Sequence, residues 1–310
     1  MKRILFIGGG GFIGSNIISD IDGESYEAHV VEPMGANLSR LDGMDVIIHR
    51  ANISDIDVLT DIIDTNHIDI LVHLVSTLIP GSSFEDYKEE YKNIIFPSIE
   101  LMEICAKRHI KFVFFSSGGT VYGSRNLKSS FKESDELAPI SYYGWSKQIM
   151  ENSILFKNRT EALDYLILRP SNPYGHGQNL HARQGLIAVA IGCMLDGKPL
   201  EIWGDGSAVR DYIYIKDLVN VFWKLIDNKV LNTTLNIGSG EGYSVNEILD
   251  VIMAVSHQNL KISYKNSRCS DVSYMVLDNS NLKRYVEVPM TPIDKGIEMF
   301  YKEMTKNYKK

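Results

Sequence analysis

The stretch that decides the fold stands at the start of the chain: Gly8-Gly9-Gly10-Gly11-Phe12-Ile13-Gly14. It follows a short apolar run and opens a helical pattern, which is the strand–turn–helix context in which G-x-x-G-x-x-G binds a dinucleotide. Gly8, Gly11 and Gly14 let the backbone turn sharply and approach a pyrophosphate, and a helix N-terminus attracts phosphate. We therefore expect a dinucleotide-binding loop here.

Short apolar runs alternate with helical patterns over the first half of the chain. Runs of this length are typical of parallel strands covered on both faces. Their alternation with helices predicts an α/β fold, a Rossmann-type doubly wound parallel sheet. Pro97 lies inside the third helix and should kink it. The expected strands are Ile4–Ile7, Ala28–Val31, Val46–His49, Ile70–Leu74, Phe112–Ser116 and Tyr165–Leu168, and the expected helices are Gly11–Asp20, Asp55–Asn66, Phe84–Arg108 and Tyr143–Asn158.

The character of the sequence changes after Arg169, where loops rich in Gly, Pro and Asn begin. We expect residues 1–169, with a contribution from about 207–237, to form the dinucleotide-binding domain. Residues 170–206 and 238–310 should form a smaller, mixed α/β lobe that lends a strand or helix back to the main sheet. Expected elements are strands at Leu200–Trp203, Asp211–Ile215 and Thr234–Ile237, helices at Gly185–Asp196, Asp217–Asp227 and Val245–Ser256, and then an irregular tail.

Composition narrows the class of protein. The 310 residues carry a net charge of −7, which argues against a nucleic-acid or anionic-membrane partner. Three cysteines, odd in number and far apart, suit a reducing cytoplasm. The histidines never pair at metal-ligand spacing, so we expect no metal. No apolar run reaches the roughly 18–20 residues that a membrane-spanning helix needs.

Tyr143 and Lys147 are four residues apart, so on a helix they face the same way. A free tyrosine titrates near ~10, too high for a general base at neutral pH. We expect the Lys147 ammonium to lie beside the Tyr143 hydroxyl and to lower its pKa, with the charge of an oxidised nicotinamide adding to the effect. The pair predicts proton transfer coupled to hydride transfer.

Glu32 ends the second expected strand, 18 residues beyond Gly14. An acidic side chain at this point accepts hydrogen bonds from the adenosine ribose and repels a 2′-phosphate, which favours NAD over NADP. The alternative is a solvated surface glutamate.

Further motifs extend over about the whole chain: Phe115-Ser116-Ser117-Gly118-Gly119-Thr120-Val121-Tyr122-Gly123, L-R-P-S-N-P-Y-G at Leu168–Gly175, Val209–Ile213 and Leu235–Gly240. With the glycine loop and Y-x-x-x-K, the chain resembles the extended short-chain dehydrogenase/reductase family. Within this family it is most similar to nucleotide-sugar epimerases of the UDP-glucose 4-epimerase type. The resemblance implies NAD as cofactor, a nucleotide sugar as substrate, and a homodimer formed through the helices at about Phe84–Arg108 and Tyr143–Asn158.

The resemblance also implies roles for individual residues. Tyr143 would be the acid/base, and Lys147 would hold the nicotinamide ribose and tune that tyrosine. On the substrate side, Asn172 would contact the pyrophosphate, and Trp203 would stack on the base. Arg210 and Arg268 would clamp the pyrophosphate, and Asp271 would take the ribose hydroxyls. The implied cofactor contacts are Gly8, Gly11, Phe12, Ile13, Gly14, Glu32, Asn52, Ile53, Leu74, Val75, Ser76, Asn93, Ser116, Tyr143, Lys147 and Pro170.

The chain departs from the family pattern at several positions. Gly118 stands where many relatives carry the serine or threonine that bonds the reacting oxygen, so Ser117 or Thr120 must supply that hydroxyl. We favour Ser117, because the Gly118-Gly119 pair permits positive φ and lets the loop bend. Asn52 replaces an aspartate near the adenine, and Leu78 replaces a cofactor-binding lysine.

The residues before Val121 also bear on the reaction. Family members that eliminate water carry an Asp-Glu pair there, whereas this chain has Gly119 and Thr120. We therefore expect a nucleotide-sugar 4-epimerase. A 4-keto-sugar reductase using NADH or NADPH is the alternative, and a non-catalytic NAD-binding scaffold is a remote one, since fold alone does not fix function.

Overall fold

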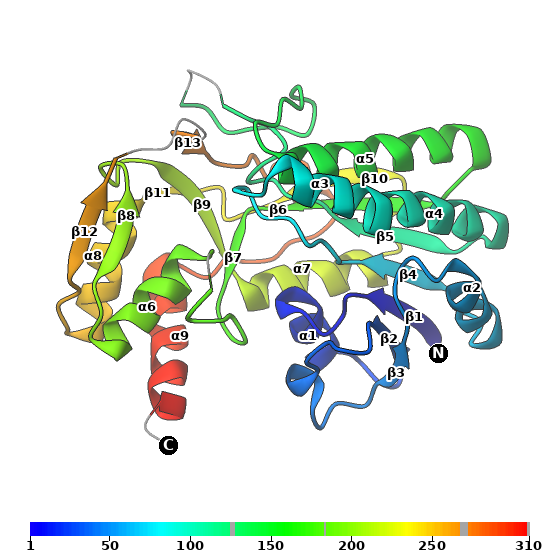
Figure 1. Ribbon diagram of the computed structural model, residues 1–310, viewed down its shortest axis with the longest axis horizontal. Helices are drawn as coiled ribbons and strands as arrows, with labels where there is room; N and C mark the ends of the chain where they lie inside the picture. Colours follow the sequence, from blue (N-terminus) through cyan, green and yellow to red (C-terminus); the bar gives the residue numbers. More distant parts are fainter. Residues whose placement is uncertain (125–127, 183, 267–271, 309–310) are drawn as a thin grey trace.

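The computed structural model describes residues 1–124, 128–182, 184–266 and 272–308. Seven strands, all paired in parallel, form the main sheet in the order β10-β6-β5-β4-β1-β2-β3 (Figure 1). This confirms the expected doubly wound sheet. The strands are β1 (Lys2–Ile7), β2 (Tyr26–Glu32), β3 (Ile47–Arg50), β4 (Ile70–His73), β5 (Lys111–Phe115), β6 (Tyr165–Pro170) and β10 (Thr233–Ile237).

Both faces of this sheet are covered by helices. Along β1, Ile4 and Phe6 pack into one core and Leu5 and Ile7 into the other, because side chains alternate along a strand. Helices α1 (Phe12–Ser19) and α7 (Ile215–Asp227) contribute to the first core. Helices α2 (Ile56–Thr65), α4 (Phe96–Arg108) and α5 (Tyr142–Glu161) contribute to the second.

The expected helix over Phe84–Arg108 is in fact interrupted. It consists of α3 (Phe84–Glu90), a π-helical turn over Tyr91–Ile95, and α4. Pro97 lacks the N–H that would bond the carbonyl of Asn93, four residues earlier and inside the π-helical turn. The irregularity therefore lies in the turn that a proline at position 97 disturbs.

A smaller lobe, at the left of Figure 1, is built around β9 (Val209–Tyr214). This strand pairs with β7 (Asn172–Tyr174), β11 (Gly242–Ser244) and β13 (Tyr274–Met275). Strands β8 (Leu200–Trp203) and β12 (Ile262–Lys265) form a second small sheet. Within the segment from about 207 to 237, β10 and α7 belong with the main sheet, whereas β9 belongs to the smaller lobe. Helices α6 (Leu186–Asp196) and α8 (Val245–Ser256) pack beside these strands.

The expectation of an irregular tail is wrong. After β12 and β13 come a short 3-10 helix, Leu282–Arg284, and the 16-residue helix α9 (Ile293–Tyr308). Buried Ile293, Ile297 and Phe300 supply the apolar face of α9 at helical spacing. This i, i+4, i+7 pattern was available in the sequence.

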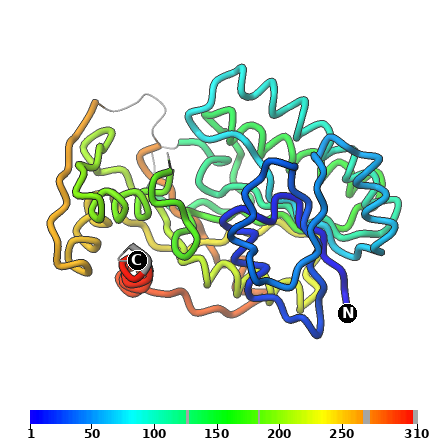
Figure 2. Tube along the Cα trace, turned by 60° about the horizontal axis from the view of Figure 1, so that its bottom comes forward, coloured from blue at the N-terminus to red at the C-terminus, as the bar shows by residue number. Residues whose placement is uncertain are grey.

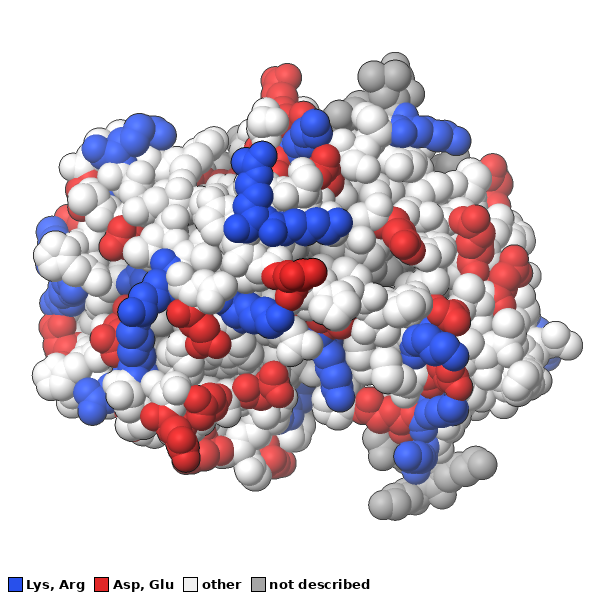
Figure 3. Space-filling view, turned by 180° about the vertical axis from the view of Figure 1, so that it is seen from behind, with Lys and Arg blue, Asp and Glu red and all other residues white. Residues whose placement is uncertain are grey.

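The outer surface carries charges of both signs. On the face in Figure 3, lysine and arginine side chains are interspersed with aspartate and glutamate. The N-terminus lies beside the main sheet and the C-terminus at the end of α9 in the smaller lobe (Figures 1 and 2). None of the helices in the described ranges is long and apolar enough to span a membrane.

Candidate active site

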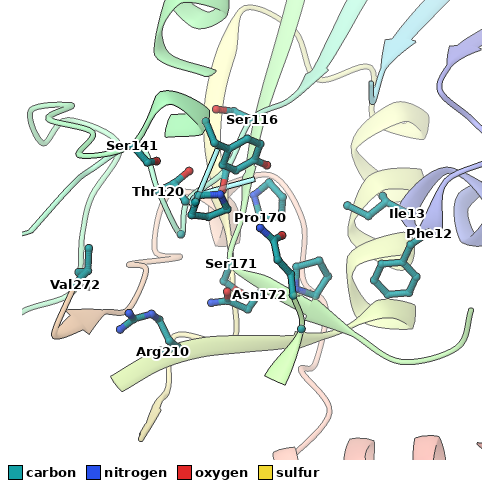
Figure 4. Close-up of a pocket in the computed structure, with 18 of the residues that line it drawn as sticks. Phe12, Ile13, Ser116, Thr120, Ser141, Pro170, Ser171, Asn172, Arg210 and Val272 are labelled. Atoms are coloured by element: carbon teal, nitrogen blue, oxygen red, sulfur yellow. The ribbon is translucent and has the colours of Figure 1, made fainter. Parts of the chain in front are cut away.

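A cleft opens at the carboxyl ends of the main-sheet strands, the edge at which open α/β sheets bind ligands. It consists of two cavities of about 440 and 320 Å³ that share Asn172, Gln178 and Arg210 in their walls. Phe12 and Ile13 of α1 lie on one side of the first cavity, with Thr120 and Ser141 on the opposite side (Figure 4). The cleft therefore joins the glycine loop to the smaller lobe.

The glycine loop is packed too tightly for side chains at key points. Gly8 has φ +82°, a conformation that other residues rarely adopt. A Cβ on Gly14 would lie 2.5 Å from the Gly9 carbonyl oxygen, so α1 and the loop can touch only through glycine. The same loop donates the Gly10 N–H to Glu32 Oε1 at 2.8 Å.

Helix α5 places Tyr143 and Lys147 together, as their spacing predicts. Tyr143 lines the cleft, and Lys147, which is 5% exposed, lies beneath it. Lys147 Nζ is 5.6 Å from the centre of the Tyr143 ring and donates a hydrogen bond to the Phe115 carbonyl at 2.9 Å. The ammonium therefore faces the ring of Tyr143 and the end of β5.

The electrostatics of this pair differ from expectation. Burial raises the pKa of Tyr143, a hydrogen bond from Ser117 lowers it, and the charge of Glu90 raises it further, with a net upward shift. Burial lowers the pKa of Lys147 to about 8, against the opposing charges of Glu90 and Glu151. In the protein without ligands, the free-energy cost of burying the Tyr143 phenolate is larger than the stabilisation that the nearby Lys147 ammonium gives it.

Ser117 and Thr120 both line the cleft beside Tyr143. Ser117 is close enough to Tyr143 to lower the pKa of the tyrosine. The Thr120 hydroxyl is buried and has no hydrogen-bond partner among the residues that the structure describes. A buried hydroxyl without a partner costs free energy, so Thr120 is available to a polar ligand.

Gly118 departs from the family pattern for a steric reason. A Cβ there would lie 2.6 Å from Leu277 Cδ1 and 2.9 Å from the Arg169 carbonyl oxygen. Gly118 and Gly119 are not among the glycines with positive φ in the described chain, so the expectation that the pair bends through such angles is wrong. The glycine at 118 leaves room for β6 and Leu277.

The other expected cofactor residues follow strands β3, β4 and β6 of the main sheet or end them. Ile53 is buried, and Asn52 is exposed and donates to Asp55 Oδ2 at 3.1 Å. Leu74, Val75 and Ser76 form the loop after β4, and a Cβ on Gly8 would lie 3.1 Å from the Val75 nitrogen. Pro170 lines the cleft.

Asn93 does not join them. It lies in the π-helical turn, is exposed, and donates its amide to Glu89 Oε2 at 3.0 Å. The expectation that Asn93 orders the cofactor side of the site therefore finds no support in its position.

At the other end of the cleft, Trp203 of β8 and Arg210 of β9 line the second cavity. Asn172 lines both cavities and donates its amide to the Asp211 carbonyl at 2.7 Å. Arg268 and Asp271 lie outside the described residues.

Comparison with known proteins identifies the family. The sequence model of the NAD dependent epimerase/dehydratase family matches residues 4–238. The chain belongs to this family. A Methanocaldococcus jannaschii protein provisionally named UDP-glucose 4-epimerase is 30% identical, with 98% of this chain and 99% of that protein covered.

Two further relatives bear on the reaction of this epimerase/dehydratase family member. An Escherichia coli dTDP-4-dehydro-6-deoxyglucose reductase is 28% identical, with 97% of each chain covered. The crystal structure of Thermotoga maritima UDP-glucose 4-epimerase with UDP-glucose is similar, with a TM-score of 0.92 and 28% identity over 98% of this chain and 99% of that one.

The family implies NAD, and the residues present fit it. Among the described residues no side chain caps the N-terminus of α1, so its first N–H groups are left for an anion such as the pyrophosphate. Glu32 places a half-buried carboxylate at the end of β2, where the adenosine ribose binds in this fold. Tyr143 lines the same cavity as Phe12 and Ile13 at the start of α1.

A buried network behind the cleft was missed by the sequence analysis. Ser116 donates its hydroxyl to Glu151, which also binds Arg169 Nη2 at 2.6 Å. Arg169 Nη1 donates to the Tyr122 hydroxyl at 2.8 Å, and Tyr122 donates to Asn236 Oδ1 at 2.6 Å. Ser116 therefore belongs to this network and also lines the first cavity of the cleft. Glu151 lies four residues after Lys147, on the same helix face, which is the signal that could have found it.

Proposed function

We propose that this epimerase/dehydratase family member is an NAD-dependent nucleotide-sugar 4-epimerase that works through a transient 4-keto sugar. A UDP-glucose/UDP-galactose pair, or a related nucleotide hexose, is the proposed substrate. The observation that carries the proposal is that Tyr143 and Ser117 line one end of a cleft that continues to the smaller lobe. Trp203 and Arg210 line its other end. One end has the groups for proton transfer at a sugar hydroxyl, and the other suits a nucleotide.

NAD, when bound, supplies a hydride acceptor and donor for the sugar C4. Tyr143 takes the proton from the C4 hydroxyl and later returns it to the C4 oxygen. Ser117 donates a hydrogen bond to that oxygen, where negative charge develops. Lys147 favours the phenolate of Tyr143 because opposite charges attract across a dry site. Thr120 offers its unpaired hydroxyl to the sugar.

The smaller lobe holds the nucleotide. Trp203 is 47% exposed, and its aromatic ring is the proposed contact of the base. Arg210 and Asn172 bind the pyrophosphate, with Arg268 and Asp271 as the proposed further contacts. Held at its nucleotide end, the 4-keto sugar turns within the first cavity and presents its other face. We therefore assign nucleotide-sugar binding to residues 170–206 and 238–310 together with β9, and NAD binding to residues 1–169 with β10 and α7.

A second candidate function is reduction of a 4-keto sugar. Two observations favour it: the Escherichia coli relative is a reductase, and the raised pKa of Tyr143 suits a proton donor. The same residues would carry out a single hydride and proton transfer to the 4-keto sugar, with net consumption of NADH or NADPH.

The deciding experiment denatures freshly purified protein and measures the nucleotide released. The epimerase should release close to one NAD per chain and convert UDP-glucose and UDP-galactose into each other without net oxidation of NADH. An empty protein that oxidises NADH or NADPH in proportion to an added 4-keto sugar is instead the reductase.

The homodimer is also part of the proposal. The outer faces of α3, α4 and α5 carry exposed aromatic side chains, and a patch of this kind marks an interaction surface. The exposed aromatic residues of the patch are Phe84, Tyr91, Phe96, Trp145 and Phe156. Light scattering should give twice the chain mass, and Phe96→Asp should give the monomer; a monomeric native protein rules the dimer out.

A cytoplasmic location is proposed from the cysteine content alone.

A further inference from the structure

Gly119 lines the first cavity of the cleft, and neither its backbone conformation nor its packing requires a glycine. It is not among the described glycines with positive φ, so its backbone does not exclude a side chain. A Cβ there would lie 3.7 Å or more from the nearest atoms outside its chain neighbours, which is ordinary van der Waals contact. The neighbouring Gly118 differs, because its Cβ would lie 2.9 Å from the Arg169 carbonyl oxygen.

The turn that contains Gly119 is held by its backbone. The nitrogens of Thr120 and Val121 both donate to the Ser117 carbonyl, at 3.2 and 3.1 Å. Neither bond needs a bare Cα at position 119. Where the backbone is compatible with alanine, glycine lowers stability because it has more conformational freedom to lose on folding. The glycine at 119 therefore costs stability without a steric reason within the described chain.

The missing side chain would point into the space between the two ends of the cleft. The atoms nearest to its Cβ position are the Asn172 amide oxygen and nitrogen, at 3.7 and 4.0 Å, and Ser117 Oγ, at 3.9 Å. Both residues line the first cavity of about 440 Å³, as does Thr120 (Figure 4). Asn172 also lines the second cavity, so this space adjoins both the proton-transfer end and the nucleotide end. It is open to a ligand.

Epimerisation at C4 makes a particular demand on such a space. A sugar held at its nucleotide end must present first one face of C4 and then the other, while Tyr143 and Ser117 keep their places. The keto sugar therefore needs clearance beyond the volume that it fills at rest, whereas a single hydride transfer does not. A side chain in the wall would oppose the turn, because closely packed atoms give way only at a cost in free energy.

We propose that Gly119 determines the specificity of the reaction, because its missing side chain leaves the room in which the 4-keto sugar turns. The inference rests on the proposed function, since a reductase does not need the turn. Gly119 supplies no group for proton transfer. It decides whether hydride can return to the opposite face of C4.

The test adds one methyl group with Gly119→Ala. This variant should keep the wild-type Tm or exceed it slightly, and should retain the wild-type amount of bound NAD, measured after denaturation. Its kcat for the interconversion of UDP-glucose and UDP-galactose should fall roughly tenfold or more, with little change in KM. Gly119→Leu should lose more. Two controls bracket the change: Gly23→Ala, in a surface turn with no atom within 4 Å, should keep normal turnover, and Gly118→Ala should lower the Tm.

Single-turnover mixing with UDP-glucose separates turning from hydride transfer. The absorbance of NADH reports the first hydride transfer, which should proceed in Gly119→Ala at the wild-type rate although galactose forms slowly. A slowed first transfer, a rise confined to KM or a loss of bound NAD overturns the inference, because the space would then serve the resting sugar or the nicotinamide. A Tm lowered as far as in Gly118→Ala also overturns it.

The wild-type protein separates this inference from the proposed function. Failure of the wild type to interconvert the two sugars overturns the proposed function and this inference with it. An active wild type with equally active Gly119→Ala and Gly119→Leu variants overturns the inference alone.

Discussion

Arg169 and Glu151 form an ion pair behind the cleft: Arg169 Nη2 lies 2.6 Å from Glu151 Oε2, with the two side chains only 5% and 1% exposed. The pair joins β6 to α5, the helix that carries Tyr143 and Lys147. Ser116 and Tyr122 complete its hydrogen bonds, so the end of β5 is tied to the same network.

Arg169→Met should destabilise the protein strongly because it leaves the Glu151 carboxylate buried without its partner. Breaking a buried pair in this way costs about 3–5 kcal/mol. Arg108→Met is the control, since it removes an exposed partner of Asp64 and should cost less than about 1 kcal/mol. Urea unfolding measures both, and similar losses in the two variants would contradict the expectation.

Tyr143→Phe should lower turnover by roughly 10²–10⁴-fold, because only the proton-transfer group is lost. NAD and substrate binding should change little. Tyr142→Phe makes the same chemical change one residue earlier, at a side chain stacked on Tyr87, and should keep near-normal turnover. Steady-state kinetics of both variants decide the matter; an active Tyr143→Phe enzyme would show that the central assignment is wrong.

Ser117→Ala should reduce kcat more than Thr120→Ala. Ser117 lines the cleft with Tyr143 and would donate to the reacting oxygen, and such a donor is worth about 2.7–4 kcal/mol, or roughly 10²–10³ in kcat. Thr120→Ala should act mainly on the KM for the sugar nucleotide, since it removes a free hydroxyl from the wall of the cleft. A severe loss of kcat confined to Thr120→Ala reverses the two roles.

Glu32 should discriminate between cofactors. A 2′-phosphate beside this carboxylate should weaken NADP binding at least tenfold relative to NAD, about 1.4 kcal/mol. Glu32→Ala should reduce the ratio of the Kd for NADP to the Kd for NAD. Glu24→Ala, on the surface loop before β2, should leave this ratio unchanged. Fluorescence titration with each nucleotide gives the ratios, and equal affinities in the wild type would refute this role.

Lys147→Met should stabilise the protein in a pH-dependent way. Burial lowers the pKa of Lys147 from 10.5 to about 8, so below pH 8 the folded chain buries a charge at a cost on the order of 3 kcal/mol. Between these pH values the unfolded chain binds more protons, and the wild type gains stability as pH rises. The advantage of Lys147→Met should therefore be largest below pH 8 and vanish toward pH 10.5.

Urea unfolding of both proteins across this range measures that difference, with Lys107→Met as the control at an exposed site. An advantage independent of pH would show that packing, and not the buried charge, decides the stability of the variant.

Local sequence determined the parts of this protein that depend on near neighbours. Within the glycine loop, Gly14 is required by the backbone of Gly9 only five residues earlier. The four-residue spacing of Tyr143 and Lys147 brings them together on one helix face. Alternating apolar runs likewise predicted the parallel sheet. The helix over Ile293–Tyr308 was also readable, because Ile293, Ile297 and Phe300 have helical spacing.

Tertiary structure decided what depends on residues distant in the chain. Gly118 is required because Leu277 and the Arg169 carbonyl occupy its side-chain space. Burial raises the pKa of Tyr143, although the Lys147 ammonium lies one helical turn away. One π turn encloses Glu90 and exposes Asn93, a change of a single residue in helical register. Desolvation and register arise from packing across the whole fold, so no local pattern around Tyr143 or Glu90 could specify them.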